Sequence, residues 1–309
     1  MTGALLLLCL AGTPEAFAAL GGQIDADPHG VLDAGLRSGP YSLQLRTDTV
    51  ELSYAPTHAT GRAWVTLRLQ GFAAQMLISP WSNGAKDPSR ALVAMMGEVN
   101  GGWVENLGHG FYSGLRARAR GYLFFARSDE TRIATPDPTA RLEPGAFAGY
   151  WSEPLRAELG TRAYLGGERV GVNVEGTFTW APRWGVAPRV SAWFGVGENL
   201  DFLTTTRLGG LNPYVIPLAG AAWAEWWVED YVAGRAGIAA NLGPVELTPF
   251  VDAARFDGTN AVGFGLQTHA TFEDFFVTAI GGYAPFIERA PGVSRVSLWV
   301  LAGSSWIGL

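Results

Sequence analysis

The stretch SGLRARARGYLFF, residues 113–125, decides the fold class. Its odd positions from Leu115 to Phe125 are apolar or small, whereas the even positions Arg116, Arg118 and Arg120 are charged. Successive side chains of a strand point to opposite faces, so this stretch has one apolar and one basic face. Three arginines cannot point into the dry core of a β-sandwich, but they can line a wet lumen while the apolar face meets lipid. The stretch therefore predicts a strand of a transmembrane β-barrel.

The same alternation recurs along most of the chain. Residues 62–70 place apolar side chains at odd positions, opposite Arg62 and Arg68 at even ones. About 12 strands can be traced in this way, and the regions 71–112 and 128–149 have room for roughly two to four more. The sequence therefore predicts an all-β fold, a single transmembrane antiparallel β-barrel. Other segments that follow the pattern are 155–165, 169–180, 189–197, 231–241, 245–256 and 261–272.

The connections between these strands differ in length. The turns after 155–165, 189–197, 231–241 and 261–272 are short, whereas the stretch 209–230 and several others are longer. Short turns on one rim and longer loops on the other are typical of outer-membrane barrels.

The bulk composition also favours a membrane protein. Charged residues make up 16% of the chain, against roughly 25% in soluble domains. A soluble β-sandwich would share the many glycines and aromatics but not this shortage of charge. The net charge is −6 and Lys86 is the one lysine, so nucleic-acid binding is not expected. After the first 20 residues no run of 18 apolar residues occurs, so a helical membrane span is not expected.

The N-terminus resembles a secretory signal peptide. An apolar run is followed by Ala16, Phe17 and Ala18, which predicts cleavage after Ala18 or Ala19. The single cysteine, Cys9, would leave with the signal, so neither a disulfide nor a thiolate metal site is expected. The expected organisation is a signal peptide at 1–18, a short periplasmic segment at 19–40 and an outer-membrane barrel at 41–309.

Five short motifs follow one another in the C-terminal third. Their order resembles the Omp85 superfamily, the barrels related to the outer-membrane assembly factor and the two-partner secretion transporters. The resemblance implies roughly 16 strands. Members that insert or secrete proteins carry periplasmic POTRA domains, and the chain has no room for one, so a barrel-only form is expected. The motifs are RLGGLNPY (207–214), PFVDAA (249–254), GFGLQ (263–267), GGYAPF (281–286) and RVSLWVLAGSSW (295–306).

The resemblance assigns a lid loop to residues 209–230. In the family a lid arginine reaches through the lumen to acidic groups, and the matching contact here would join Asn212 to Asp252. A neutral amide makes a hydrogen bond about half as strong as a guanidinium does, and Arg207 is the alternative partner. A plain extracellular loop at 209–230 is the competing interpretation. The residues expected at this lid and lumen contact are Arg207, Gly209, Gly210, Asn212, Tyr214, Phe250, Asp252, Gly263 and Gly265.

The lumen-facing arginines are the main electrostatic feature of the sequence. They form either a basic stripe that favours anionic solutes or a set of ion pairs with Glu158, Glu175, Glu246 and Asp252. The stripe comprises Arg68, Arg116, Arg118, Arg120, Arg156 and Arg162, with Arg62 beside them.

An enzymatic barrel is not expected from the histidines. His29 and His58 fall in a pre-barrel segment and a turn, and His109 has Ser113 nearby but no acidic partner at a usable spacing. His269 is expected to face the lumen as a hydrogen-bonded structural residue. No histidine–carboxylate cluster has metal-ligand spacing, so neither a metal nor a cofactor is expected.

The sequence therefore predicts a bacterial outer-membrane barrel acting in protein insertion, secretion or lipid handling. Its expected partners are outer-membrane lipids, unfolded barrel clients and periplasmic accessory proteins. The alternative function is a passive, porin-like channel for small solutes with a basic lumen.

Overall fold

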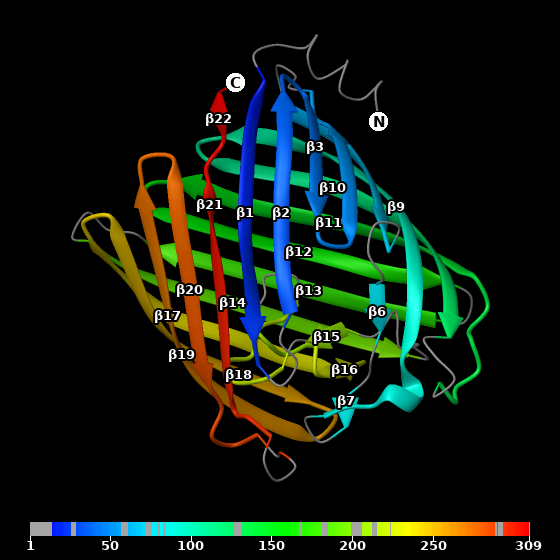
Figure 1. Ribbon diagram of the computed structural model, residues 1–309. Coiled ribbons are helices and arrows are strands. Elements are labelled where there is room, and N and C mark those ends of the chain that lie inside the picture. Colours follow the sequence, from blue (N-terminus) through cyan, green and yellow to red (C-terminus); the bar gives the residue numbers. More distant parts are fainter. Residues whose placement is uncertain are drawn as a thin grey trace.

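The computed structural model is a closed antiparallel β-barrel of 16 strands (Figure 1). It describes residues 14–25, 29–56, 61–71, 76–78, 81–82, 85–126, 131–166, 169–180, 185–198, 206–211, 215–222, 224–287, 289 and 293–308. In this described part no helix is long and apolar enough to cross a membrane. The barrel strands are β1 (Glu15–Ile24), β2 (His29–Ser38), β3 (Tyr41–Arg46), β4 (Thr49–Tyr54), β5 (Gly61–Gln70), β9 (Leu92–Gly108), β10 (Phe111–Ala126), β11 (Thr139–Ser152), β12 (Leu155–Gly166), β13 (Arg169–Trp180), β14 (Val186–Glu198), β17 (Tyr231–Leu242), β18 (Val245–Phe256), β19 (Thr259–Phe272), β20 (Phe275–Tyr283) and β21 (Val296–Ser304).

Each strand pairs with the next along the chain, and the last strand returns to the first. Strand β21 pairs with β1 from Ala19↔Gly303 to Ile24↔Leu298, which closes the barrel. The expectation of 16 strands is confirmed. The shorter elements are β6 (Met76–Ile78) and β22 (Ile307–Gly308), which pair with β9 and β1, the hairpin of β7 (Trp81–Ser82) and β8 (Ala85–Lys86), the 3-10 helix Pro88–Arg90, and the separate pair β15 (Thr206–Leu208) and β16 (Trp226–Val228).

The N-terminal boundaries predicted from the sequence are wrong. Residues 15–24 and 29–38 form β1 and β2, which pair with each other and join β21 to β3, so 19–40 is not a periplasmic segment. Ala18 lies inside β1, opposite Ala34, and cleavage after it would divide a barrel strand. Residues 1–13 lie outside the described residues, and the signal peptide itself stays a prediction.

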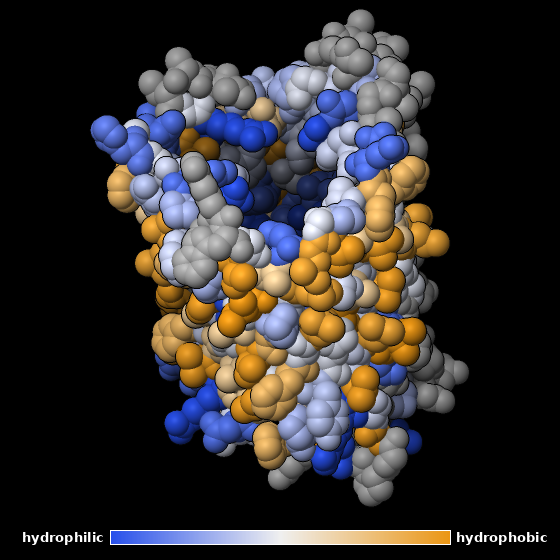
Figure 2. Space-filling model, turned by 90° about the vertical axis from the view of Figure 1, so that its left-hand side faces the viewer, coloured by the Kyte–Doolittle hydropathy of each residue, from blue (hydrophilic) through white to orange (hydrophobic). Residues whose placement is uncertain are grey.

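The two faces of the wall follow residue parity all round the barrel. Arg116, Arg118 and Arg120 face inward on β10, whereas Leu115 and Leu123 are exposed on the outside. Figure 2 shows the outward side chains as a hydrophobic belt with hydrophilic residues above and below, and a hollow with a hydrophilic lining at the upper rim. A continuous apolar belt of this kind is what the lipid-facing surface of a barrel requires.

The long connections share one rim. Residues 71–91, 127–138, 199–230 and 284–295 connect strands at the rim opposite the start of β1 and the end of β21. The sequence-based assignment of the short turns is partly wrong. The turn after β12 lies on the long-loop rim, and the turn after β14 is the start of the connection 199–230.

Candidate functional site: a lid inside the barrel lumen

The described residues of the segment 206–228, namely 206–211, 215–222 and 224–228, fold into the lumen. At one wall, Asn173 Nδ2 of β13 donates to Thr206 Oγ1 at 3.3 Å. Three strands further along the wall, the backbone N–H of Ala219 donates to Asp252 Oδ2 of β18 at 2.8 Å. Trp227 of the same segment packs against buried residues of β9 and β10, and six strands separate β9 from β18 along the wall. Because the segment contacts the inner face of such separate parts of the wall, it is an inward-folded lid and not an external loop. We call residues 206–228 the lid.

Asp252 is the anchor between the lid and the barrel wall. Its fully buried carboxylate accepts hydrogen bonds from Arg235 Nε at 2.6 Å and Nη2 at 2.8 Å, in addition to the Ala219 N–H. The Arg235 guanidinium lies 4.0 Å from the ring centroid of Phe250. The bidentate partner of Asp252 is therefore Arg235 of β17, which the sequence motifs did not indicate. Asn212 and Tyr214 lie outside the described residues.

Three glycines make the docking surface for the lid. A Cβ on Gly263 would lie 2.4 Å from the Ala219 carbonyl oxygen, and one on Gly282 would lie 2.6 Å from the Ala219 Cβ. A Cβ on Gly265 would lie 2.2 Å from Cζ of Phe250. A real Cβ essentially never makes contacts this short. Gly263 and Gly282 therefore admit only glycine while the lid is docked, and Gly265 leaves room for the Phe250 ring of the wall. Gly263 and Gly265 of the Gly-x-Gly motif thus give room to the lid and to the Phe250 ring.

A second anchor joins the same part of the lid to the last strand. The N–H of Gly220 donates to Ser297 Oγ at 2.9 Å, and both residues are buried. The lid also turns sharply at Gly209 and Gly210, which have φ of +118° and +90°. A side chain disfavours such backbone angles, so glycine suits both positions.

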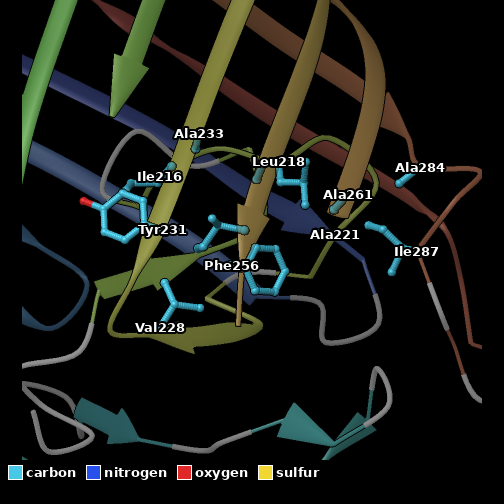
Figure 3. Close-up of a cluster of buried hydrophobic side chains, with 12 residues drawn as sticks. Ile216, Leu218, Ala221, Val228, Tyr231, Ala233, Phe256, Ala261, Ala284 and Ile287 are labelled. Atoms are coloured by element: carbon cyan, nitrogen blue, oxygen red, sulfur yellow. The ribbon is translucent and has the colours of Figure 1, made fainter. Parts of the chain in front are cut away.

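Apolar side chains of the lid pack against the barrel wall. Figure 3 shows Ile216, Leu218 and Val228 of the lid beside Tyr231 and Phe256 of the wall. A separate cluster joins Leu211 of the lid to wall residues of β18, β20 and β21, namely Phe250, Ile280 and Trp299. Burial of these groups, at about 25 cal/mol per Å² of apolar surface, favours the docked position.

A buried ion pair ties the lid to the connection after β20. Glu225 pairs with Arg289, and it also accepts a hydrogen bond from the N–H of Ala222 at 2.9 Å. Arg289 Nη2 donates to the carbonyl oxygen of Gly220 at 3.2 Å. Burial raises the pKa of Glu225 above its ordinary value, and the Arg289 charge opposes that rise.

The arginines of β10 are ion-paired through two buried glutamates. Arg118 pairs with Glu143 of β11, and Arg120 Nε lies 2.7 Å from Glu98 Oε2 of β9. Arg141 Nε lies 2.9 Å from Glu143 Oε1. Sequence reasoning missed both glutamates, which lie in regions where it found no strand.

The remaining arginines of the predicted stripe have different neighbours. Arg116 pairs with Glu175 at 3.2 Å, as expected, whereas Arg156 is exposed and lies over the Trp151 ring at 4.6 Å. Arg68 pairs with Glu51 at 2.6 Å and Glu98 at 3.2 Å, and Arg162 lies 3.9 Å from Glu143. The other predicted acidic partners bind elsewhere: Glu158 accepts from Tyr112, Glu246 from Arg189 and Asp252 from Arg235.

Arg207 does not substitute for a lid arginine at Asp252. It lies on β15 with its guanidinium 5.2 Å from the Trp227 ring centroid, and Trp227 packs against the wall formed by β9 and β10. His269 faces the lumen, where its two ring nitrogens lie 2.7 Å from Thr278 Oγ1 and 3.2 Å from Thr271 Oγ1. His109 is a turn residue with φ of +52°.

Comparison with solved structures identifies the fold. CdiB from Acinetobacter baumannii superposes with a TM-score of 0.67 at 10% identity, over 94% of this chain and 60% of that one. BamA from Haemophilus ducreyi lacking POTRA domains 1–3 gives 0.64 at 11% identity, over 95% and 70% of the two chains. CdiB from Escherichia coli gives 0.63 at 11%, over 94% and 63%. The chain has the barrel fold of these CdiB and BamA structures.

The chain spans about 60% of the length of the two CdiB structures. Its sequence matches no protein-family model and no curated protein. Within this barrel, the four motif residues Phe250, Asp252, Gly263 and Gly265 lie together beneath one stretch of the lid. The motifs PFVDAA and GFGLQ, which helped to indicate the fold from the sequence, thus lie together where the wall contacts Ala219 of the lid.

Proposed function

We propose that the protein is an Omp85-type barrel of the bacterial outer membrane that inserts or secretes polypeptides or handles lipid, with residues 206–228 as its resting lid. The observation that supports this most strongly is the docking of the lid across the lumen, from Trp227 at β9 and β10 to Ala219 at β18. The apolar belt of the outer surface supports the membrane location. Lipids, unfolded barrel clients and periplasmic accessory proteins are the proposed partners.

The polar anchors of the lid suit a part that moves. The Ala219 and Gly220 N–H groups each make one hydrogen bond to the wall, worth about 0.5–1.5 kcal/mol net. Water in the lumen can replace both bonds when the lid leaves. A client entering the lumen would have to replace these bonds and the apolar contacts of the lid, while the 16-stranded wall stays intact.

A passive channel with a basic lumen has less support. A resting open pore has no use for a buried segment across its lumen. Arg118 and Arg120 are ion-paired with Glu143 and Glu98, so these two arginines of the stripe do not face the lumen as unpaired charges. The lid and these ion pairs both favour a gated barrel over a standing anion pore.

Reconstitution into liposomes tests the proposed activity. The purified full-length protein would be placed in liposomes of outer-membrane lipids, and urea-denatured barrel client would be added by dilution. We expect client insertion, measured by protease protection and gel mobility of the folded form, to exceed that of protein-free liposomes several-fold. A barrel of the same size without a lid is the control for membrane perturbation. Insertion equal to that control, together with no secretion or lipid-transfer activity in matched assays, would contradict the proposal.

A further inference from the structure

Tyr122 of β10 is a buried phenol with an unusual set of neighbours. Arg120 Nη1 donates to its oxygen at 3.2 Å and Arg141 Nη2 donates at 3.1 Å. The hydroxyl still carries its own proton, and a buried donor normally has an acceptor. Within the described part of the chain no oxygen accepts that proton. The Tyr122 hydroxyl therefore needs a hydrogen-bond acceptor, and that acceptor would lie beside the guanidinium donors of Arg120 and Arg141.

The lid brings a third guanidinium to the same wall. Arg207 stacks over Trp227, which packs against the cluster that contains Tyr122. Arg207 makes no ion pair with any described residue. Burial lowers its pKa, Tyr122 opposes that effect, and the charges of Arg120 and Arg141 lower the pKa further. The lid thus carries a positive charge toward a wall that is already positive.

The charge balance of this wall points to an anion. Among the described residues, and with Arg141 left out of the count, the four other arginines of the ion-pair network share three carboxylates, which leaves one positive charge in excess, and Arg207 raises the excess to two. A guanidinium fork and a phenol O–H are donors only in this arrangement, and guanidinium forks match the oxygens of phosphate groups. The network consists of Arg68, Arg118, Arg120, Arg141 and Arg162 with Glu51, Glu98 and Glu143.

We propose that Arg207, Tyr122 and Arg141 form a binding site for a phosphate-type oxyanion between the lid and the barrel wall. Arg207 comes from the lid, whereas Tyr122 and Arg141 come from β10 and β11. An anion bound by the lid residue and by the two wall residues would attach the lid to β10 and β11. Asp252 on β18 does not contact this part of the wall. The phosphate comes either from the free ion or from a lipid headgroup. Binding is measured without transport, so this site stands or falls separately from the proposed function.

Phosphate titration of the delipidated full-length protein in detergent tests the site. Isothermal calorimetry and thermal unfolding would be followed with inorganic phosphate and pyrophosphate, at constant ionic strength maintained with chloride. We expect saturable binding and a rise in Tm. Loss of one charge-assisted contact should weaken binding about tenfold or more in Arg207→Gln. Arg207→Lys keeps the charge but lacks the guanidinium fork, so its phosphate affinity should lie between those of the wild type and Arg207→Gln. Tyr122→Phe should weaken phosphate binding several-fold.

Arg189→Gln is the matched control, because Arg189 is another lumen arginine in a pair with Glu246 on a different part of the wall. Equal losses of phosphate affinity in Arg189→Gln and Arg207→Gln would mean that phosphate is attracted by the positive charge of the lumen in general. That result would overturn the proposed site. No phosphate dependence in a protein that migrates as a folded barrel would overturn it as well. Native mass spectrometry of protein extracted from membranes distinguishes the sources. A retained lipid mass that is lost in Arg207→Gln identifies a headgroup, and saturable phosphate binding without retained lipid identifies the free ion.

Discussion

The backbone N–H of Ala219 donates a hydrogen bond of 2.8 Å to the carboxylate of Asp252. These residues lie 33 positions apart in the chain, one in the lid and the other on β18. The same carboxylate holds Arg235, so a single acidic group fixes the lid to the wall and neutralises a lumen cation. The effect of removing it shows how strongly the lid is held.

Asp252→Ala is expected to release the lid and to destabilise the barrel. The substitution leaves the Arg235 charge and the Ala219 N–H without their acceptor, and breaking a buried ion pair costs about 3–5 kcal/mol. We expect a lower Tm and greater uptake of large antibiotics by cells that carry the variant. Glu246→Ala on the same strand is the control, because it removes a pair with Arg189 and touches no described residue of the lid. Equal antibiotic uptake in the two variants would contradict the anchoring role.

Gly263→Val is expected to displace the lid without removing any polar group. Its Cβ would meet the Ala219 carbonyl oxygen at 2.4 Å, and overpacking of this kind costs about 1–3 kcal/mol. Protease accessibility of the lid in intact outer-membrane vesicles is the measurement. Gly281→Ala on the neighbouring strand is the control, since no atom lies within 4 Å of its Cβ position. A lid equally protected in both variants would show that Ala219 does not rest against Gly263.

The Glu225–Arg289 pair is expected to give the stability of the lid a pH dependence. Burial raises the pKa of Glu225 above its ordinary value of 4.5, so the folded state holds the proton more tightly than the unfolded state does. The corresponding stability is present below pH 4.5 and is lost as the pH rises through the raised pKa. Wild type should therefore gain Tm relative to Glu225→Gln as the pH is lowered from about 8 to about 4. A difference in Tm that stays constant over this range would contradict the assignment.

Truncation tests the placement of the first strand. Glu15–Ala18 pair with β2, and Glu15 and Ala16 also pair with β22. A chain that begins at Ala19 loses these contacts at the closure, so its Tm should fall below that of a chain that begins at Pro14. Identical Tm values and folding yields would mean that the barrel closes without this part of β1.

The charged strands could be predicted from the sequence because their two faces differ. The alternation around Arg116, Arg118 and Arg120 gave the correct inward face. Strand β1, EAFAALGGQI, has small residues on both faces, so parity carries little signal there. Its Ala16–Phe17–Ala18 sequence instead matches a signal-peptidase site, which led to the wrong boundary.

The partners of the charged residues depend on register, which the sequence shows only at tight turns. The turn Gly243–Pro244 pairs Leu242 with Val245, and counting back from it places Arg235 opposite Asp252, as observed. Between β9 and β10 the register shifts at Phe111/Tyr112, and this irregularity brings Glu98 opposite Arg120. A shift of one residue exchanges the two faces of a strand, so the ion pair could not be found without the structure.

Planar-bilayer conductance tests most directly whether the lid closes the lumen. The purified full-length protein should be electrically quiet for most of the recording, with brief openings at most. Replacing residues 206–228 by a short Gly-Ser linker should give a steady open pore with a conductance several-fold higher. A wild-type protein that conducts steadily, with the same conductance after this replacement, would contradict a closing lid and would favour a passive channel.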